Sequence, residues 1–226
     1  MIPSPLPHYI HHINPKLKHT YLRFNDEGIL EIRSSGLTRT QIETLLLKKS
    51  RWIRNAQARI ESKLGRYPDF NIEPQLYYLG TAYPVQLVEK QQKRTSLAFH
   101  DTHFTLTFDQ FDIQQFQKKI DLFYRKEASR IIPPIVDEYA KKMSLYPSQI
   151  RFRKTKRQWG SCSADHTLSF NTMLAKLPLS TITYVVIHEL AHIRHKHHQR
   201  SFWALVEETM PTYKQEVAIL KTYTTY

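Results

Sequence analysis

The alternation of hydrophobic and polar positions predicts strands near the start of the chain. Residues 21–24 and 29–33 alternate apolar and polar side chains, which is the period of a half-buried strand. Between them, residues 25–28 (Asn-Asp-Glu-Gly) are typical of a turn. We therefore expect a β-hairpin here.

The next stretch changes to the period of a helix. Apolar residues recur at mostly helical spacing over residues 38–64, and Thr40 and Glu43 have the spacing of a capping box. This pattern predicts one long helix. After a turn-rich stretch over residues 65–74, four short strands are expected at 77–80, 83–89, 96–99 and 104–108.

A second long helix is expected from residue 112 to residue 143. Pro133 and Pro134 lie inside it. Proline removes a backbone donor and clashes with the preceding turn, so we expect a kink or a split at this point.

The last third of the chain predicts two strands and a buried helix. Residues 150–158 and 167–173 are typical of strands, and residues 163–166 of the turn between them. Ser180 can cap a helix that is apolar nearly all round, which indicates burial. Together these elements predict an α+β fold, with a β-rich region containing one long helix over residues 1–110 and a second region over residues 111–226.

Composition narrows the class of protein. The 226 residues include 33 Lys and Arg against 20 Asp and Glu, a net charge of +13, which favours anionic partners or simply a solubilising surface. No run of 18 apolar residues occurs, so no membrane span is expected. Cys162 is the only cysteine, which excludes intrachain disulfides and cysteine-rich metal sites and favours a reducing, cytoplasmic location.

The buried helix contains an H-E-x-x-H motif, His188-Glu-Leu-Ala-His192. Side chains four residues apart lie on one helix face, so His188 and His192 can bind one zinc ion. Glu189 is turned by about 100° from His188 and can reach a zinc-activated water without being a ligand. This spacing is that of a metal-assisted hydrolase.

A catalytic zinc needs a third protein ligand and an open fourth position. The alternatives downstream are His195, His197, His198, Glu207, Glu208 and Glu216. His195 lies about 10.5 Å beyond His188 along a continued helix, too far to share an ion. His198 requires the helix to end before it, and a glutamate requires a later helix to return antiparallel. Spacing ranks His198 first, with the glutamates next.

The motifs of the last third resemble a known family. They are Trp159-Gly-Ser-Cys162, Phe170-Asn171, Tyr184-Val-Val-Ile-His-Glu-Leu-Ala-His192, His198, Phe202-Trp203 and Met210-Pro-Thr-Tyr-Lys214. With looser matches before them, they resemble the YgjP-like zinc metallopeptidases, which are similar to the SprT-like and WLM zincins. Here His197 replaces the family's Asn before the third ligand, so an exchange of His197 and His198 stays open.

The resemblance implies a zincin-like metallopeptidase core over residues 111–226. In it, His188, His192 and His198 bind one zinc ion and Glu189 is the catalytic acid/base. The expected function is zinc-dependent hydrolysis of peptide bonds in a peptide or protein substrate. The strand over residues 167–173 is either a core strand or the edge on which an extended substrate pairs.

Two further features carry alternatives. Cys162 is expected to be a small buried residue in a hairpin turn, with a zinc ligand or redox switch as the alternative. The basic strand from Arg151 to Arg157, with Trp159, could contact nucleic acid. The rival hypothesis is therefore a basic nucleic-acid-associated protein with a structural zinc, or a protease acting near DNA.

Overall fold

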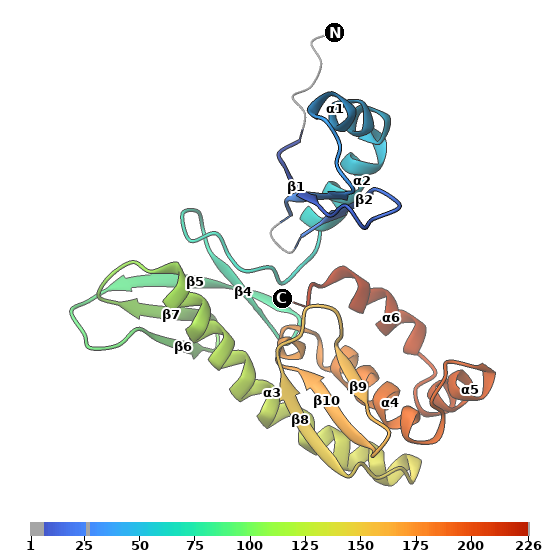
Figure 1. Cartoon of the computed structure of the whole chain (residues 1–226). Coiled ribbons are helices and arrows are strands. Elements are labelled where there is room, and N and C mark those ends of the chain that lie inside the picture. Colours follow the sequence, from blue (N-terminus) through green and yellow to red (C-terminus); the bar gives the residue numbers. More distant parts are fainter. Residues whose placement is uncertain (1–6, 26–27, 226) are drawn as a thin grey trace. The chain divides into compact units, whose positions relative to one another are not determined.

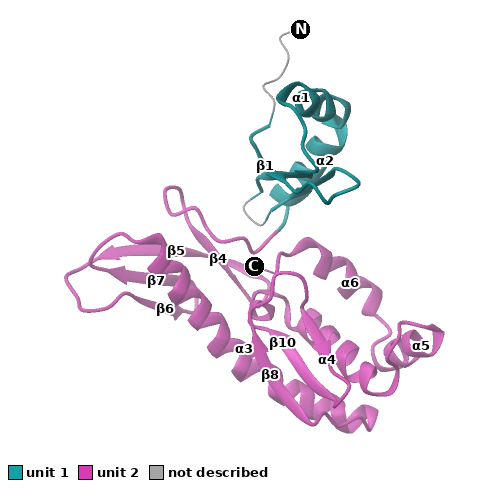
Figure 2. Cartoon of the chain, in the orientation of Figure 1, with its two compact units in different colours: residues 1–63 teal, residues 64–226 magenta. Residues whose placement is uncertain are grey.

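The computed structural model describes residues 7–25 and 28–225. These residues form six α-helices, one short 3₁₀ helix and three small sheets, a mixed α/β architecture. The chain divides into two compact units, Met1–Lys63 and Leu64–Tyr226 (Figure 2).

The first unit contains a three-stranded sheet in the order β1-β3-β2. Its strands are β1 (Tyr9–Ile13), β2 (Tyr21–Phe24) and β3 (Leu30–Ser34). β2 and β3 pair antiparallel, which confirms the predicted hairpin, while β1 pairs parallel with β3. Asp26 and Glu27 of the predicted turn lie outside the described residues.

Two helices pack on this sheet where one was expected. They are α1 (Arg39–Lys48) and α2 (Ser50–Glu61). Lys49 between them has φ −99° and ψ 7°, outside the helical region, so the prediction of a continuous helix over residues 38–64 is wrong. Ile42, Leu46 and Ile53 nevertheless share one core with the sheet, because the apolar stripe continues across the break.

The capping box of α1 lies two residues earlier than predicted. Thr38 Oγ1 accepts a hydrogen bond from the Gln41 N–H (3.3 Å), and Gln41 Oε1 accepts one from the Thr38 N–H (2.8 Å). Glu43 instead forms an ion pair with Arg39 (3.1 Å). The same sequence pattern therefore caps the helix from a different pair of residues.

The second unit begins with a four-stranded sheet in the order β4-β5-β7-β6 (Figure 1). The strands are β4 (Gln75–Tyr78), β5 (Thr81–Glu89), β6 (Ser96–His100) and β7 (His103–Phe108), which confirms the four predicted strands with shifted bounds. Leu79 and Gly80 form the β4–β5 turn, both with positive φ. Their N–H groups donate to the carbonyls of Ala175 and Lys176, at 3.0 and 2.9 Å.

Helix α3 (Ile113–Met143) runs through Pro133 and Pro134 without interruption, so the helix is not split there. Asp112 caps it by accepting from the N–H groups of Gln114 and Gln115. Its buried side chains recur every four positions from Phe116 to Ala140. The prolines lie between two members of this stripe, which packs on the core along the whole helix.

The third sheet has the order β8-β10-β9, with β8 (Gln149–Arg153), β9 (Gly160–Cys162) and β10 (Thr167–Asn171). β10 pairs parallel with β8 and antiparallel with β9. The predicted hairpin of residues 150–158 with residues 167–173 is therefore wrong. The turn after Cys162 joins β9 to β10, because the strand that begins near Ile150 ends at Arg153.

Four helical segments complete the chain. They are the 3₁₀ helix η1 (Thr172–Lys176), α4 (Leu179–Arg194), α5 (Arg200–Thr209) and α6 (Tyr213–Thr222). Helix α4 packs against α3, β9, α5 and α6, which explains why it is apolar nearly all round. Ser180 is not its cap, since the helix begins after Pro178 and the Ser180 hydroxyl donates to Glu216 (3.1 Å).

One hydrophobic core extends through the second unit. It includes Phe104 and Phe108 from the sheet together with Phe116 from α3 and Leu168 from β10. The expected boundary at residue 110 lies inside this core, whereas the compact units divide at residue 63. Within residues 7–25 and 28–225, no helix is both long and apolar enough to cross a membrane.

The β4–β5 turn, which packs against Pro178 before α4, should be sensitive to one added methyl group. A Cβ at position 80 would lie 2.8 Å from Pro178 Cγ, at a φ of 88°. Gly80→Ala is therefore expected to lower the free energy of unfolding by about 1–3 kcal/mol, measured by urea denaturation. In a Pro178→Ala background Cγ is absent, so the same substitution should cost less. An equal cost in both backgrounds would contradict this contact.

Candidate metal centre

Helix α4 of the second unit contains His188, Glu189 and His192. Because His188 and His192 are one turn apart, their rings lie on one face, with centroids 4.9 Å apart. The helix ends at Arg194, and His195 has an extended backbone, with φ −121° and ψ 102°.

The segment after this helix end turns back toward the two histidines. His198 lies between α4 and α5, and its ring centroid is 5.0 Å from that of His188 and 4.6 Å from that of His192. The condition that the sequence set for His198, a helix end between it and His192, is therefore met.

The three imidazoles form a cluster that fits a metal ion. One ligand nitrogen from each of His188, His192 and His198 lies within 4.8 Å of the others, and the Nε2 atoms of His188 and His198 are 3.0 Å apart. Nitrogens about 2.0–2.1 Å from a tetrahedral zinc are roughly 3.4 Å apart, so little rotation is needed. In the part of the chain that the structure describes, no fourth His, Cys, Asp or Glu joins this cluster.

One hydrogen bond and burial keep His188 and His192 in the form that binds metal. His192 Nδ1 lies 2.9 Å from the His195 carbonyl oxygen, which can only accept, so Nδ1 carries the proton and Nε2 presents its lone pair. Burial, helped by the neighbouring imidazoles, lowers the pKa of His188 to about 3. Burial also lowers the pKa of His192. Both rings are neutral at pH 7, as metal binding requires.

Aromatic side chains of α5 hold the histidines in place. The fully buried Phe202 ring has its centroid 4.9 Å from His188, 4.6 Å from His192 and 4.8 Å from His198. Trp203 stacks on His198 at 5.6 Å. The rings therefore have few alternative orientations.

Glu189 lies between α4 and the β8-β10-β9 sheet. Its side chain is 5% exposed, and burial raises the pKa of its carboxyl to about 8. A cation held by the adjacent imidazoles would favour the ionised form and lower that pKa. A Cβ at position 160 would lie only 2.6 Å from Glu189 Oε1 and 2.7 Å from its Cγ. Gly160 of β9 is thus the residue that makes room for this carboxylate.

The edge of β9 beside Glu189 has unpaired backbone groups. Trp159 O accepts from Asn171 N (2.8 Å), and Ser163 N donates to Thr167 O (3.0 Å). By the alternation of an antiparallel ladder, Gly160 and Cys162 direct their backbone groups to the free edge. β10 lies between β8 and β9, so of the two alternatives for residues 167–173 the core strand is confirmed and the substrate edge is wrong.

The other candidate ligands have different places. Glu216 accepts hydrogen bonds from Thr181 (2.6 Å) and Ser180 at the start of α4, and Glu207 forms an ion pair with Lys214 (3.2 Å). His195, His197 and Glu208 are outside the histidine cluster.

The predicted basic strand is shorter than expected. Arg151 and Arg153 share one face of β8, but Arg157 and Trp159 follow the end of that strand and do not extend its face. Lys154 forms an ion pair with Asp121 (2.8 Å). A continuous basic strand over residues 151–157 is therefore absent.

Cys162 was expected in a hairpin turn, but it lies on strand β9. It is partly buried, and burial raises the pKa of its thiol. Among the described residues it does not belong to the metal-binding cluster. A thiol with a raised pKa is less reactive at neutral pH.

The sequence did not identify Gly160 and Phe202 as site residues. A glycine inside a strand often marks a close approach of another group, which was the available signal for Gly160. Phe202 gave no signal beyond its place in the family motif, because a buried aromatic residue is usually only part of a core.

Convergent imidazoles beside a buried carboxylate are an arrangement that metal-dependent hydrolases use. The model of the YgjP-like metallopeptidase domain matches residues 18–223, and the chain belongs to this family. The protein is accordingly a metal-dependent peptidase. No curated protein shows significant similarity to the chain.

Two solved metallopeptidase zymogens are similar to part of the chain. Abylysin of Pyrococcus abyssi is 23% identical over 40% of this chain and 92% of its own, with a TM-score of 0.38. Jannalysin of Methanocaldococcus jannaschii is 21% identical over 38% of this chain and 93% of its own, with a TM-score of 0.35. None of these comparisons supports nucleic-acid binding.

The hydrogen bonds of Glu216 predict a structural effect without loss of metal. Glu216→Ala leaves the Thr181 and Ser180 hydroxyls without this acceptor, so the free energy of unfolding should fall by about 1–3 kcal/mol. Urea denaturation and metal analysis of the same samples measure both quantities. Glu207→Ala, which breaks an exposed ion pair, should cost less than about 1 kcal/mol. Loss of metal from Glu216→Ala would instead make Glu216 a ligand.

Proposed function

We propose that this protein is a zinc-dependent peptidase in which His188, His192 and His198 hold one zinc ion and Glu189 moves the proton. The observation that carries the proposal is the cluster of three histidine ligand atoms within 4.8 Å, beside the buried Glu189 carboxylate. The family of the chain supplies the reaction class.

The donor set supports zinc in a catalytic site. Imidazole nitrogen is a ligand that zinc prefers, and three protein ligands leave the fourth position open, as catalytic sites require. Held there, the ion would supply Lewis-acid chemistry by acidifying a water and polarising a peptide carbonyl. A structural zinc would need a fourth protein ligand, which the described residues do not add to the cluster.

Glu189 has the position for a general base that becomes a general acid. Its carboxylate would accept the proton of the attacking water and deliver it to the nitrogen of the leaving amine. Burial excludes competing hydrogen bonds with solvent, and Gly160 leaves the space that the carboxylate occupies. The His195 carbonyl would hold the His192 tautomer while the proton moves.

The free edge of β9 is the place we assign to the substrate backbone. Gly160 and Cys162 direct N–H and C=O groups outward, so an extended peptide can add as a further strand. Because Gly160 also touches Glu189, a peptide bound there lies next to the proposed base. No nucleic-acid function is proposed, since the three-ligand cluster and the family membership both favour hydrolysis.

Metal analysis with peptide hydrolysis tests the assignment. Wild-type protein is expected to hold one zinc per chain, and His188→Ala, His192→Ala and His198→Ala should each lose it with activity. Glu189→Gln should keep zinc while kcat falls by about 10²–10⁴, because only proton transfer is removed.

The neighbouring histidine provides the matched control. His197→Ala removes the same chemical group from the same turn, yet His197 is outside the cluster. It should keep both zinc and activity. Zinc retained in His198→Ala but lost in His197→Ala would exchange their roles, and a wild type that takes up no zinc would contradict the proposal.

The contact between Gly160 and Glu189 predicts a loss of activity from a single added methyl. Gly160→Ala should displace the carboxylate while leaving the histidines in place, so zinc is kept and kcat falls by about 10²-fold. Glu189→Asp shortens the side chain and makes room for the methyl. The two substitutions should therefore be non-additive in kcat, and additive losses would contradict a direct contact.

A further inference from the structure

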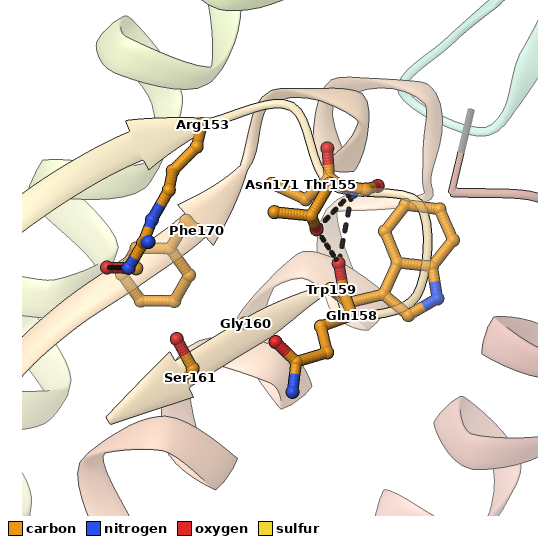
Figure 3. Close-up of a pocket in the computed structure, with 9 residues that line it drawn as sticks. Arg153, Thr155, Gln158, Trp159, Gly160, Ser161, Phe170 and Asn171 are labelled. Carbon is orange, nitrogen blue, oxygen red and sulfur yellow. Dashed lines mark hydrogen bonds between the residues drawn. The ribbon is translucent and has the colours of Figure 1, made fainter. Parts of the chain in front are cut away.

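A small hollow lies beside the β8-β10-β9 sheet and the chain segment that joins β8 to β9. Arg153, Gln158, Trp159, Gly160, Ser161 and Ser169 are among the residues that line it (Figure 3). Its volume is about 60 Å³. This is far below the size of pockets that hold whole small molecules and suits a group as small as a carboxylate.

Arg153 is the charged residue of this lining. Its Nη2 donates to the Ser169 hydroxyl at 2.6 Å, and Ser169 is buried. Among the described residues, no carboxylate lies within 4.0 Å of the Arg153 guanidinium. Arg153 is exposed, and its guanidinium, which Ser169 holds by one hydrogen bond, is accessible to a carboxylate of a ligand.

The surroundings add positive charge. Arg153 also lines a second hollow, with Lys118, Arg125 and Lys154. The acid there, Asp121, is paired with Lys154 at 2.8 Å. The region around Arg153 therefore has an excess of positive charge, which favours an anionic ligand.

The hollow adjoins the proposed catalytic site through β9. Gly160 and Ser161 line the hollow, and Gly160 touches Glu189. Side chains alternate between the two faces of a sheet, so every second residue of a peptide added to β9 would face the side to which Ser161 points. Because Ser161 lines the hollow, we place such a residue beside the opening of the hollow.

We propose that this hollow binds a carboxylate of the peptide substrate, either an acidic side chain or a free C-terminus, with Arg153 as its counter-ion. The inference rests on the proposed function, because it assigns a substrate class to the same site. Arg153 is then a residue that determines specificity, while Glu189 and the histidines carry the chemistry.

Binding of matched peptides tests the proposal without turnover. Zinc-loaded Glu189→Gln protein is titrated with dye-labelled, amidated hexapeptides that carry Glu or Gln at one position, scanned along the peptide. At one position Glu is expected to bind about fivefold to tenfold more tightly than Gln, measured by fluorescence anisotropy at low salt. Equal affinities at every position would overturn the proposal, and this comparison needs no variant of Arg153.

The variants localise the effect. Adding Arg153→Gln should abolish the preference for Glu. Arg151→Gln is the matched control, because Arg151 has the same charge on the same face of β8 but does not line the hollow. If both variants lose the preference for Glu equally, the preference depends only on net charge, which overturns the proposal.

Two further arms separate the sources of the anion. Peptides without acidic residues, compared as free acid and amide, show whether a chain end uses the hollow. A single-stranded oligonucleotide whose binding depends on Arg153, when peptides show no Glu preference, would assign the hollow to phosphate and overturn the proposal. If the Glu preference holds but the wild type cleaves no peptide, the proposed function fails while the hollow stands.

Discussion

The end of helix α4 at Arg194 is the constraint on which the rest of the site depends. Ten residues separate His188 from His198, about 15 Å on a continued helix. The extended backbone of His195 stops the helix and lets His198 return. The same residue supplies the carbonyl that accepts a hydrogen bond from His192. One departure from helical geometry therefore completes the cluster and selects the tautomer of a ring within it.

The carboxylate beside the histidines depends on a different contact. Glu189 is buried, and an ionisable group in that position is costly unless something favours its charge. The adjacent imidazoles offer a place for a cation, and Gly160 offers the space. The glycine matters here for the side chain that it lacks, since its strand position leaves no room for a Cβ. Helix α4 and strand β9 approach each other closely at this pair.

Local patterns predicted the parts of the structure that depend on neighbours in sequence. The apolar helix around His188 and the hairpin of β2 and β3 follow from period and turn residues alone. Spacing ranked His198 first among the candidates for the third ligand but could not decide it, because the position of that residue depends on where the helix ends; the family resemblance also indicated His198. The strand pairing failed for a similar reason. The strands that pair with β10, and the direction of each pairing, depend on the path of residues 154–159. That segment has no periodic pattern of apolar residues.

The short stretch of sequence that contains the histidine cluster has a consequence for assembly of the site. His188, His192 and His198, together with Phe202 behind them, lie within fifteen consecutive residues. The cluster can therefore form from one helical hairpin, at a small cost in loop closure. Gly160, Arg153 and the free edge of β9 come from a separate sheet. Under the proposed assignments, affinity for metal and recognition of substrate belong to separately encoded segments, so mutation can alter one without the other.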